Sequence, residues 1–529
     1  MPPRPSPLLR RSPEAPPWTP PLHLFIPPSD DGGERGVEAL VRDFFLDPAA
    51  GFAPADVLPA RFQESEVPAG GVQMEEYLAF LRRELVAHAS RTASPRYIGH
   101  MTSALPHFVQ PLARLVAVLN QNVVKLETAS SLTPFERQAL AMMHRLIYSL
   151  PDPFYRSHVQ DPESTLGIVA SGGTVANVTA LWCARNAALG AAEGFAGVEE
   201  EGLAAALAHH GYRRAVVVGS SLMHFSFDKA AGLLGLGVRG LVRVPVDATL
   251  RVDPEAVRAA IRKCGDEGAR VLAVVGVAGS TEAGTVDPLD ELAEVAREAG
   301  AHFHVDAAWG GALLFSRRHR GLLAGIERAD TVTIDAHKQM YTPLGTGLLF
   351  FRDPCLARTV EKHARYVLRR GSGDLGRRSL EGSRPGAVVH LHAGLHLLGR
   401  RGYEYLVDMG MRRAAYMAQR IRQRPDFELL FEPQLNILLY RYLPGRFRAR
   451  ARAGILTPAD TRALNQLNRR LQKRQWDLGR TFVSRTTLER AGEEPLVALR
   501  AVLANPLTGE EDIDAVLADQ AAIARELAR

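Results

Sequence analysis

The sequence predicts an α/β protein whose largest part is a mostly parallel sheet covered by helices. Three observations carry this prediction. The chain has 529 residues, more than one ordinary hydrophobic core contains, so a large domain with smaller ones is expected. From about Leu166 onward, short β-branched runs alternate with segments whose apolar residues recur at helical spacing. Beyond about Gly402 the pattern becomes rich in helices, which indicates a smaller α+β domain.

The composition is that of a globular protein and narrows the classes of partner. Hydrophobic residues make up 46% of the chain, yet no apolar run reaches the ~18 residues of a membrane span, so no membrane contact is expected. The net charge of +6 is spread over scattered arginines, so no nucleic acid is expected as a partner. Cys183, Cys264 and Cys355 lie far apart and fit neither a disulfide framework nor a zinc site, which favours the reducing cytoplasm.

Two different segments precede the predicted sheet. Residues 1–36 are loaded with proline and lack the continuous apolar core of a secretory signal, so we expect a disordered or extended tail. Residues 37–95 are predicted to be helical, because the stretch VQMEEYLAFLRRELVAHA has apolar residues at helical spacing.

Residues 96–400 are predicted to form the large domain. Its first helix is expected at 132–150, with Thr133 as N-cap, Pro134 at N1 and Glu136 at N3. Ligands of parallel sheets bind at the carboxyl ends of the strands, so the residues that follow each strand are the candidates for chemistry. Strands are expected at 166–170, 213–219, 242–246, 270–279, 302–306, 331–336 and 345–351.

Residues 401–529 are predicted to form the small α+β domain. Helical spacing is found at 402–423 and 457–475 and again at the end of the chain. Strands are expected at 435–442, 480–488 and 495–504.

Two further patterns have better structural explanations. GLGVRG, at 235–240, matches the glycine spacing of a dinucleotide site, but it follows a helical stretch and leads into a strand, the reverse of the required order. His390, His392 and His396 lie close together, yet no acidic residue separates the last two as in a zinc-binding H-E-x-x-H. We therefore expect helix packing there, and no metal.

Residues of complementary chemistry follow four of the predicted strands. Ser171 to Thr174, with two glycines, lie between a strand and a helix, where free backbone N–H groups and the helix dipole suit a phosphate; a plain tight turn is the alternative. His224, Asp306 and Lys338 each follow another strand. An anion cradle, an aromatic ring, a carboxylate and an amine on one sheet edge suit a phosphorylated pyridine aldehyde.

These motifs resemble the pyridoxal-phosphate-dependent group II amino acid decarboxylases, and the likeness runs from about Pro95 to Leu517. It implies the fold-type I architecture, with a seven-stranded, mostly parallel sheet between helices and a small C-terminal domain. Closer likeness is to a bacterial branch described as pyridoxal-dependent aspartate 1-decarboxylases. The stretches that carry the family resemblance are SGGTVAN, HFSFDKA, AGSTEAGTVDPL, HVDAAWGG, DAHK and ANPLTGEEDID. Those that carry the closer likeness to the branch are TPFERQALAMMHRLIY, TIDAHKQMYTPLG and LEGSRPGA.

The resemblance implies a role for each cofactor-binding residue. Lys338 is implied to be the Schiff-base lysine, Asp306 to hold the pyridine nitrogen protonated, and His224 to stack on the ring. The other residues implied to contact the phosphate, the ring or its hydroxyl are Gly172, Gly173, Thr174, Ser280, Thr281, Ala308 and His337.

The resemblance also implies a substrate pocket. Arg500 matches the arginine that binds a substrate carboxylate, a task to which its paired N–H donors are suited. His100, Thr102 and Asn122 match the N-terminal side of the pocket. Tyr366 is the candidate proton donor in the mobile loop of the family, although its spacing does not match well.

Asp335 departs from the family pattern, because many relatives have asparagine at its position. A phosphate nearby would repel a second anion unless the Asp335 side chain points away.

The expected reaction is the decarboxylation of an acidic L-amino acid. The bacterial branch implies conversion of L-aspartate to β-alanine and carbon dioxide, which would supply pantothenate and coenzyme A synthesis. L-Glutamate giving 4-aminobutanoate is the alternative, and an aromatic substrate fits less well. Aminotransferases, other lyases and cysteine desulfurases use the same constellation, but Cys355 lies in no loop of the kind that a desulfurase needs. The family also implies a homodimer with shared active sites, in which residues 37–95 wrap the partner.

Overall fold

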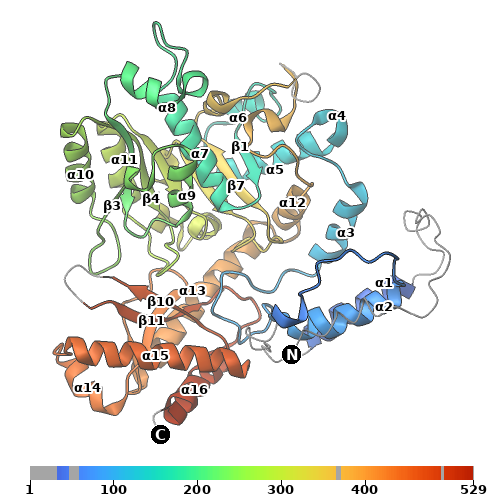
Figure 1. The fold of residues 1–529 in the computed structure, drawn as a ribbon, viewed down its shortest axis with the longest axis vertical. Helices are drawn as coiled ribbons and strands as arrows, with labels where there is room; N and C mark the ends of the chain where they lie inside the picture. The colour runs from blue at the N-terminus through green and yellow to red at the C-terminus, as the bar shows by residue number, and fades with distance from the viewer. Residues whose placement is uncertain (1–31, 47–58, 365–370, 490–493, 528–529) are drawn as a thin grey trace.

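The computed structural model describes residues 32–46, 59–364, 371–489 and 494–527. Three parts are distinct in Figure 1: a large α/β domain, a small domain beneath it, and a helical N-terminal part at its side. The predicted tail lies almost wholly outside the described residues. However, helix α1 (Gly32–Leu46) already begins within the span assigned to that tail.

The large domain is built on a seven-stranded sheet with the order β1-β7-β6-β5-β4-β2-β3. All pairs are parallel except those of β7, which runs antiparallel to both β1 and β6. All seven predicted strands are confirmed, with boundaries that differ by a few residues. They are β1 (Gly167–Ala170), β2 (Arg214–Ser220), β3 (Leu241–Val244), β4 (Ala269–Val277), β5 (His302–Asp306), β6 (Thr331–Asp335) and β7 (Gly347–Phe351).

Helices cover both faces of this sheet, because the strand residues that point to each face are apolar. Val216 and Val218 of β2 join one hydrophobic cluster, while Ala215 and Val217 join the cluster on the opposite face. Such two-sided burial is typical of parallel sheets. The surrounding helices are α5 (Leu132–Tyr148), α6 (Asp152–His158), α7 (Gly173–Ala188), α8 (Val198–His209), α9 (Ser226–Leu233), α10 (Pro254–Asp266), α11 (Leu289–Glu298) and α12 (Val388–Leu397).

The predicted cap of α5 is wrong. The helix begins at Leu132, one residue before Thr133, and its N-cap Ser131 makes no side-chain capping bond. The Thr133 hydroxyl is buried and has no hydrogen-bond partner within the described part of the chain. The Glu136 carboxylate pairs with the Arg384 guanidinium instead, so a tertiary ion pair replaces the local capping box.

The small domain is a four-stranded antiparallel sheet, in the order β10-β11-β9-β8, packed against long helices. The segment that leads into the large domain joins the edge of this small sheet through a β-bridge between Tyr97 and Phe482. Its elements are α13 (Gly399–Gln423), β8 (Phe427–Leu429), β9 (Ile437–Tyr442), α14 (Gly445–Arg452), α15 (Pro458–Leu478), β10 (Ser484–Leu488), β11 (Leu496–Val502) and α16 (Glu510–Leu527).

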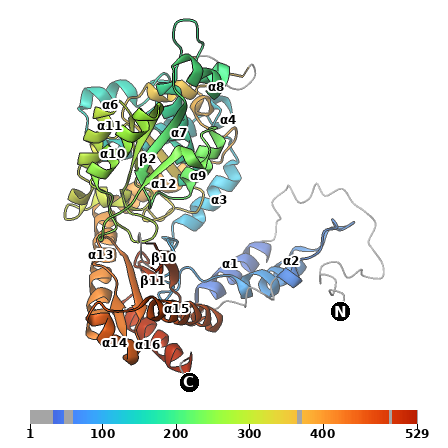
Figure 2. The ribbon, with the colours of Figure 1, turned by 60° about the vertical axis from the view of Figure 1, so that its left-hand side comes forward.

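The N-terminal part stands out from the body of the molecule beside the small domain, as Figure 2 shows for α1 and α2. The helix predicted from VQMEEYLAFLRRELVAHA is less regular than expected, because α2 (Met74–Phe80) continues as a π turn at Leu81–Leu85 and a 3₁₀ turn at Val86–His88. The remaining helices are α3 (Val109–Leu119) and α4 (Leu126–Ala129). Among the described helices, none has the length and apolar character needed to cross a bilayer.

Candidate active site

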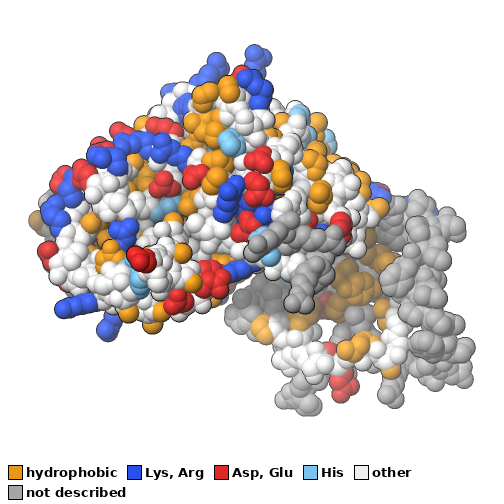
Figure 3. Space-filling view, turned by 90° about the horizontal axis from the view of Figure 1, so that it is seen from above, with side chains coloured by type: hydrophobic (Ala, Val, Ile, Leu, Met, Phe, Trp, Pro, Cys, Tyr) orange, Lys and Arg blue, Asp and Glu red, His pale blue; other side chains and the backbone are white. Residues whose placement is uncertain are grey.

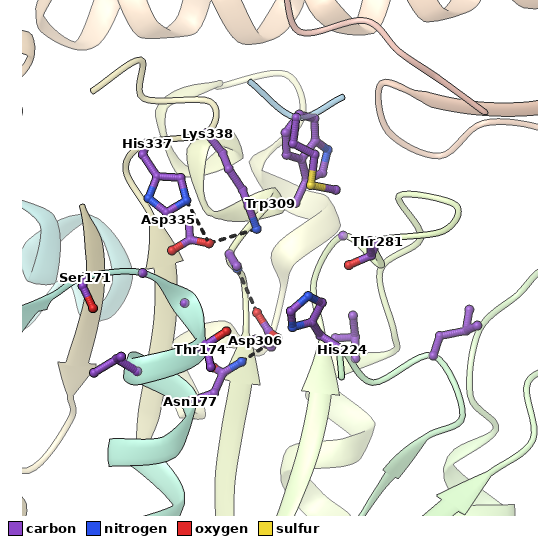
Figure 4. Close-up of a pocket in the computed structure, with 18 residues that line it drawn as sticks. Ser171, Thr174, Asn177, His224, Thr281, Asp306, Trp309, Asp335, His337 and Lys338 are labelled. Carbon is purple, nitrogen blue, oxygen red and sulfur yellow. Dashed lines mark hydrogen bonds and ion pairs between the residues drawn. The ribbon is translucent and has the colours of Figure 1, made fainter. Parts of the chain in front are cut away.

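A cavity of about 310 Å³ opens at the carboxyl ends of the strands of the large sheet. Figure 4 shows side chains from the β1–α7 turn and from the ends of β2, β5 and β6 directed into it. The cavity therefore lies at the edge of the sheet where the sequence predicted a ligand site. The sequence-predicted residues that line it are Gly172, Gly173, Thr174, His224, Thr281, Asp306, Ala308, His337 and Lys338.

The turn between β1 and α7 forms an anion cradle. Gly172 is the N-cap of α7 and has φ 156° and ψ 171°, a conformation essentially restricted to glycine. No side chain of the described residues caps this end of the helix, and its first turn lines the cavity, so its first backbone N–H groups are available to a ligand there. The His337 ring lies against the turn, with Cε1 3.5 Å from the position of a Cβ on Gly172. These groups could hold a phosphate at the positive end of the helix dipole.

Asp306 is fixed at the end of β5 by two hydrogen bonds. Asn177 Nδ2 donates to Oδ2 at 2.9 Å, and the backbone N–H of Ala308 donates to Oδ1 at 3.1 Å. The carboxyl is 6% exposed, so water competes little for it. Asp306 could hold a proton on a ring nitrogen within the cavity.

Asn177 is a functional candidate that the sequence reasoning missed. Its Oδ1 lies 3.1 Å from Nε2 of His304, and burial lowers the pKa of His304 to about 3, so that ring is neutral. A neutral His304 that donates from Nε2 fixes the amide with its nitrogen toward Asp306. The signal was available, because Asn177 is one turn after Gly173 on the cavity-facing side of α7.

Lys338 enters the cavity from the turn that follows β6. Its Nζ lies 2.9 Å from Asp335 Oδ2, and its side chain is 18% exposed. The next residue, Gln339, donates from its side chain to the backbone oxygen of Trp309 at 2.9 Å and accepts from Asn436 of the small domain at 2.8 Å. The Lys338 turn is therefore tied both to the strand end that carries Asp306 and to the small domain.

His224 follows β2 with a defined ring orientation. Its Nδ1 accepts a hydrogen bond from the backbone N–H of Ser226 at 3.2 Å, which leaves Nε2 to carry the proton of the neutral ring. Burial lowers the pKa of His224, an effect that nearby Asp306 opposes. The flat, neutral imidazole could cover a planar ligand.

Arg500 lies behind the cavity wall rather than on it. Its Nε donates to the backbone oxygen of Thr281 at 2.7 Å, and its Nη1 lies 3.2 Å from Ser484 Oγ. Nη2 is buried and has no hydrogen-bond partner among the described residues. Burial lowers the pKa of Arg500 to about 10, which still leaves it charged at neutral pH.

Four other predicted residues do not line the cavity. Ser280 Oγ instead lies 2.8 Å from Thr285 Oγ1 inside a turn. His100 Nδ1 lies 2.9 Å from Thr102 Oγ1, and burial and the charge of Arg500 lower the His100 pKa. The Asn122 side chain is engaged at the backbone of Arg384 and with Ser383. Tyr366 lies outside the described residues.

The donor set fits pyridoxal phosphate. The cradle and His337 would hold its phosphate, Asp306 its ring nitrogen and Lys338 its aldehyde carbon, while His224 would cover the ring. All of these groups converge on the same cavity (Figure 4).

Comparisons with known proteins agree with this fit. The model of the pyridoxal-dependent decarboxylase conserved domain matches residues 61–443, most of the chain. An aspartate 1-decarboxylase of Aliivibrio fischeri is 43% identical over 89% of this chain and 87% of its own. An L-2,4-diaminobutyrate decarboxylase of Rhizobium meliloti is 29% identical over 72% of this chain and 71% of its own.

Solved structures share the whole fold. Mouse CSAD superimposes with a TM-score of 0.78 at 25% identity, covering 93% of this chain and 99% of the other. Oryza sativa TDC with PLP and tryptamine gives a TM-score of 0.79 at 20% identity, covering 95% and 99%. The matched span and the Aliivibrio fischeri relative show that the chain belongs to the pyridoxal-dependent decarboxylase family.

Proposed function

We propose that this protein removes the α-carboxyl group of L-aspartate, giving β-alanine and carbon dioxide. The observation that carries the choice of substrate is the 43% identity, over most of both chains, to an aspartate 1-decarboxylase. A bovine acidic amino acid decarboxylase, 27% identical over 69% of this chain, supports the acidic substrate class. β-Alanine made in this way would supply pantothenate synthesis.

The cofactor would supply an electron sink, and residues of the chain would hold it in place and keep its ring nitrogen protonated. In this proposal Lys338 Nζ would hold the cofactor at its aldehyde carbon, the position that the substrate amine would also use. Asp306, fixed by Asn177, keeps the proton on the ring nitrogen. His224 covers one ring face, which keeps water from it. Tyr366 remains the proposed donor of the proton that replaces the carboxylate.

Arg500 is the proposed anchor for a substrate carboxylate. It is a buried cation whose Nη2 has no partner in the ranges that the structure describes, and Thr281, to which its Nε donates a hydrogen bond, lines the cavity. His100 and Thr102 are proposed to complete this side of the pocket, because burial and the charges of Arg500 and Lys338 all lower the His100 pKa. For Ser280 and Asn122 we propose only indirect roles, through the turn and the backbone that they hold.

The active form is proposed to be a homodimer. The projecting helix α2 exposes Met74 at 53% and Tyr77 at 44%, and α3 exposes Val118 at 82%. Apolar side chains of this size on projecting helices are typical of a surface that another subunit covers.

The cytoplasm is the proposed compartment, which is consistent with the free thiols of the three cysteines. On the face shown in Figure 3, acidic side chains lie among the basic ones.

A product assay tests the proposed reaction. The full chain loaded with pyridoxal phosphate is expected to release carbon dioxide and β-alanine from L-aspartate faster than it releases 4-aminobutanoate from L-glutamate. A preference for glutamate would replace the substrate assignment with that alternative, and release from neither amino acid would contradict an acidic substrate.

A further inference from the structure

Asp335 is a second acidic side chain in the cavity, and the roles described above do not use it. It ends β6 and is 5% exposed. Its Oδ2 lies 2.9 Å from Lys338 Nζ and 3.6 Å from His337 Nε2, as the dashed lines in Figure 4 show. Its Oδ1 is buried and has no hydrogen-bond partner in the described part of the chain. The carboxyl therefore does not point away from the site.

The Asp335 carboxyl lies against the first turn of the cradle helix. A Cβ on Gly173, the first residue of α7, would be 2.8 Å from Oδ2 and 3.1 Å from Oδ1. The backbone N–H groups of the same turn are those that would bind the phosphate. Asp335 and a bound phosphate would therefore share one small, largely buried space, where two negative charges disfavour each other.

Other charged or titratable groups face this carboxyl from four elements. Lys338 is its full counter-charge in the structure. Burial lowers the pKa of His337, so this ring is neutral near pH 7 and gives only partial compensation. Glu381 adds a further acidic group at the cradle, because it accepts a hydrogen bond from the Ser171 N–H at 3.0 Å. The remaining groups around the cavity are Asp306 after β5 and His224 after β2.

Cofactor loading would weaken the pairing of Lys338 with Asp335. The Lys338 nitrogen would bond to the aldehyde carbon, and the aldehyde oxygen would leave as water with two of the three ammonium protons, so the nitrogen would keep one N–H and its positive charge. At the same moment the phosphate brings new negative charge to the α7 terminus. This step releases no proton, so the Asp335 carboxylate, 2.9 Å from Nζ in the structure, would be neutralised by a proton from the solvent.

We propose that the Asp335 carboxyl takes up a proton from the solvent when the phosphate binds and donates it in a hydrogen bond, so that acid and phosphate share one proton. The balance is one solvent proton taken up at Asp335 for each cofactor bound. The inference rests on pyridoxal phosphate occupying this cavity, as proposed above.

The sharing gives cofactor affinity a specific pH dependence. Loading leaves one more proton on Asp335, so a rise in pH weakens the wild-type affinity. In an Asp335→Asn variant the amide N–H donates to the phosphate without proton uptake. The ratio of the wild-type Kd to the variant Kd is therefore expected to rise by up to about tenfold for each pH unit between about pH 6 and about pH 8. The ratio cancels the titration of the free cofactor, which is the same for both proteins.

The test measures cofactor binding rather than turnover. Cofactor-free full-length wild type and Asp335→Asn are titrated with pyridoxal phosphate, and Kd is followed by visible absorbance and tryptophan fluorescence. Asp228→Asn is the matched control, because Asp228 pairs with Arg243 at 2.9 Å outside the cavity. The Kd of Asp228→Asn is expected to equal the Kd of the wild type at each pH. Pyridoxal, which lacks the phosphate, is expected to show no pH-dependent ratio.

The results distinguish a failure of the shared-proton proposal from a failure of the proposed function. A pyridoxal phosphate ratio that is constant to within about twofold, or an equal trend with pyridoxal, would overturn the shared proton. Absence of binding to the wild type would instead reject the proposed function. Phosphorus-31 NMR of the loaded wild type needs no variant: its phosphate shift is expected to change over this pH range, and the constant shift of a dianion would overturn the inference.

Discussion

Arg500 shows how one residue of the small domain contributes to a cavity in the large one. It lies on β11, and its guanidinium reaches the backbone of Thr281 at the cavity wall. Arg500 is buried, and its Nη2 has no partner among the residues that the structure describes, so a carboxylate ligand would supply an interaction that water no longer supplies.

Removal of this guanidinium should weaken substrate binding. Arg500→Ala is expected to raise the KM for L-aspartate by about one to two orders of magnitude, the loss of one charge-assisted pair. Steady-state kinetics measure it, with Arg485→Ala on the neighbouring strand as the control, because Arg485 is exposed. An unchanged KM in Arg500→Ala would remove Arg500 from the substrate site.

At the scale of elements, the strands were predictable and one helix end was not. Buried β-branched runs such as TVTID have few alternatives to a strand, so β5 and β6 follow the predicted spans closely. The α5 cap failed because Glu136 has a partner 248 residues away, which local spacing cannot reveal. The Arg384 backbone also bonds to Asn122 and Val123, so this ion pair joins three separate segments.

Breaking the Glu136–Arg384 pair should destabilise the fold. Glu136 is 1% exposed and Arg384 8%, so Glu136→Gln leaves a buried cation without its counter-charge. The free energy of unfolding is expected to fall by about 3–5 kcal/mol, measured by chemical denaturation. Asp152→Asn is the control, because Asp152 pairs with Arg145 on the surface and its loss should cost less than about 1 kcal/mol. A Glu136→Gln effect as small as this control would show that the pair does not hold the segments together.

At the scale of the whole molecule, the parallel sheet explains why so much of the site was predictable. Parallel strands end on one edge, so Lys338, Asp306 and His224 had to meet there once the strands were placed. The directions in which the side chains point were not predictable in the same way. Nothing local to Ser280 indicated that its hydroxyl turns toward Thr285, and nothing local to Asp335 indicated that its carboxyl turns toward Lys338. Such orientations depend on contacts formed only in the folded chain.

The site as a whole depends on the bond between Lys338 and the cofactor. The measurement that tests it is the visible absorbance of the purified chain with pyridoxal phosphate, compared with Lys338→Ala and with Lys229→Ala, a control whose lysine lies over Phe225 on α9. The wild type and the control are expected to show the band of the covalent lysine–cofactor link, and Lys338→Ala to lack it. A colourless wild type, or a band that survives in Lys338→Ala, would contradict the account.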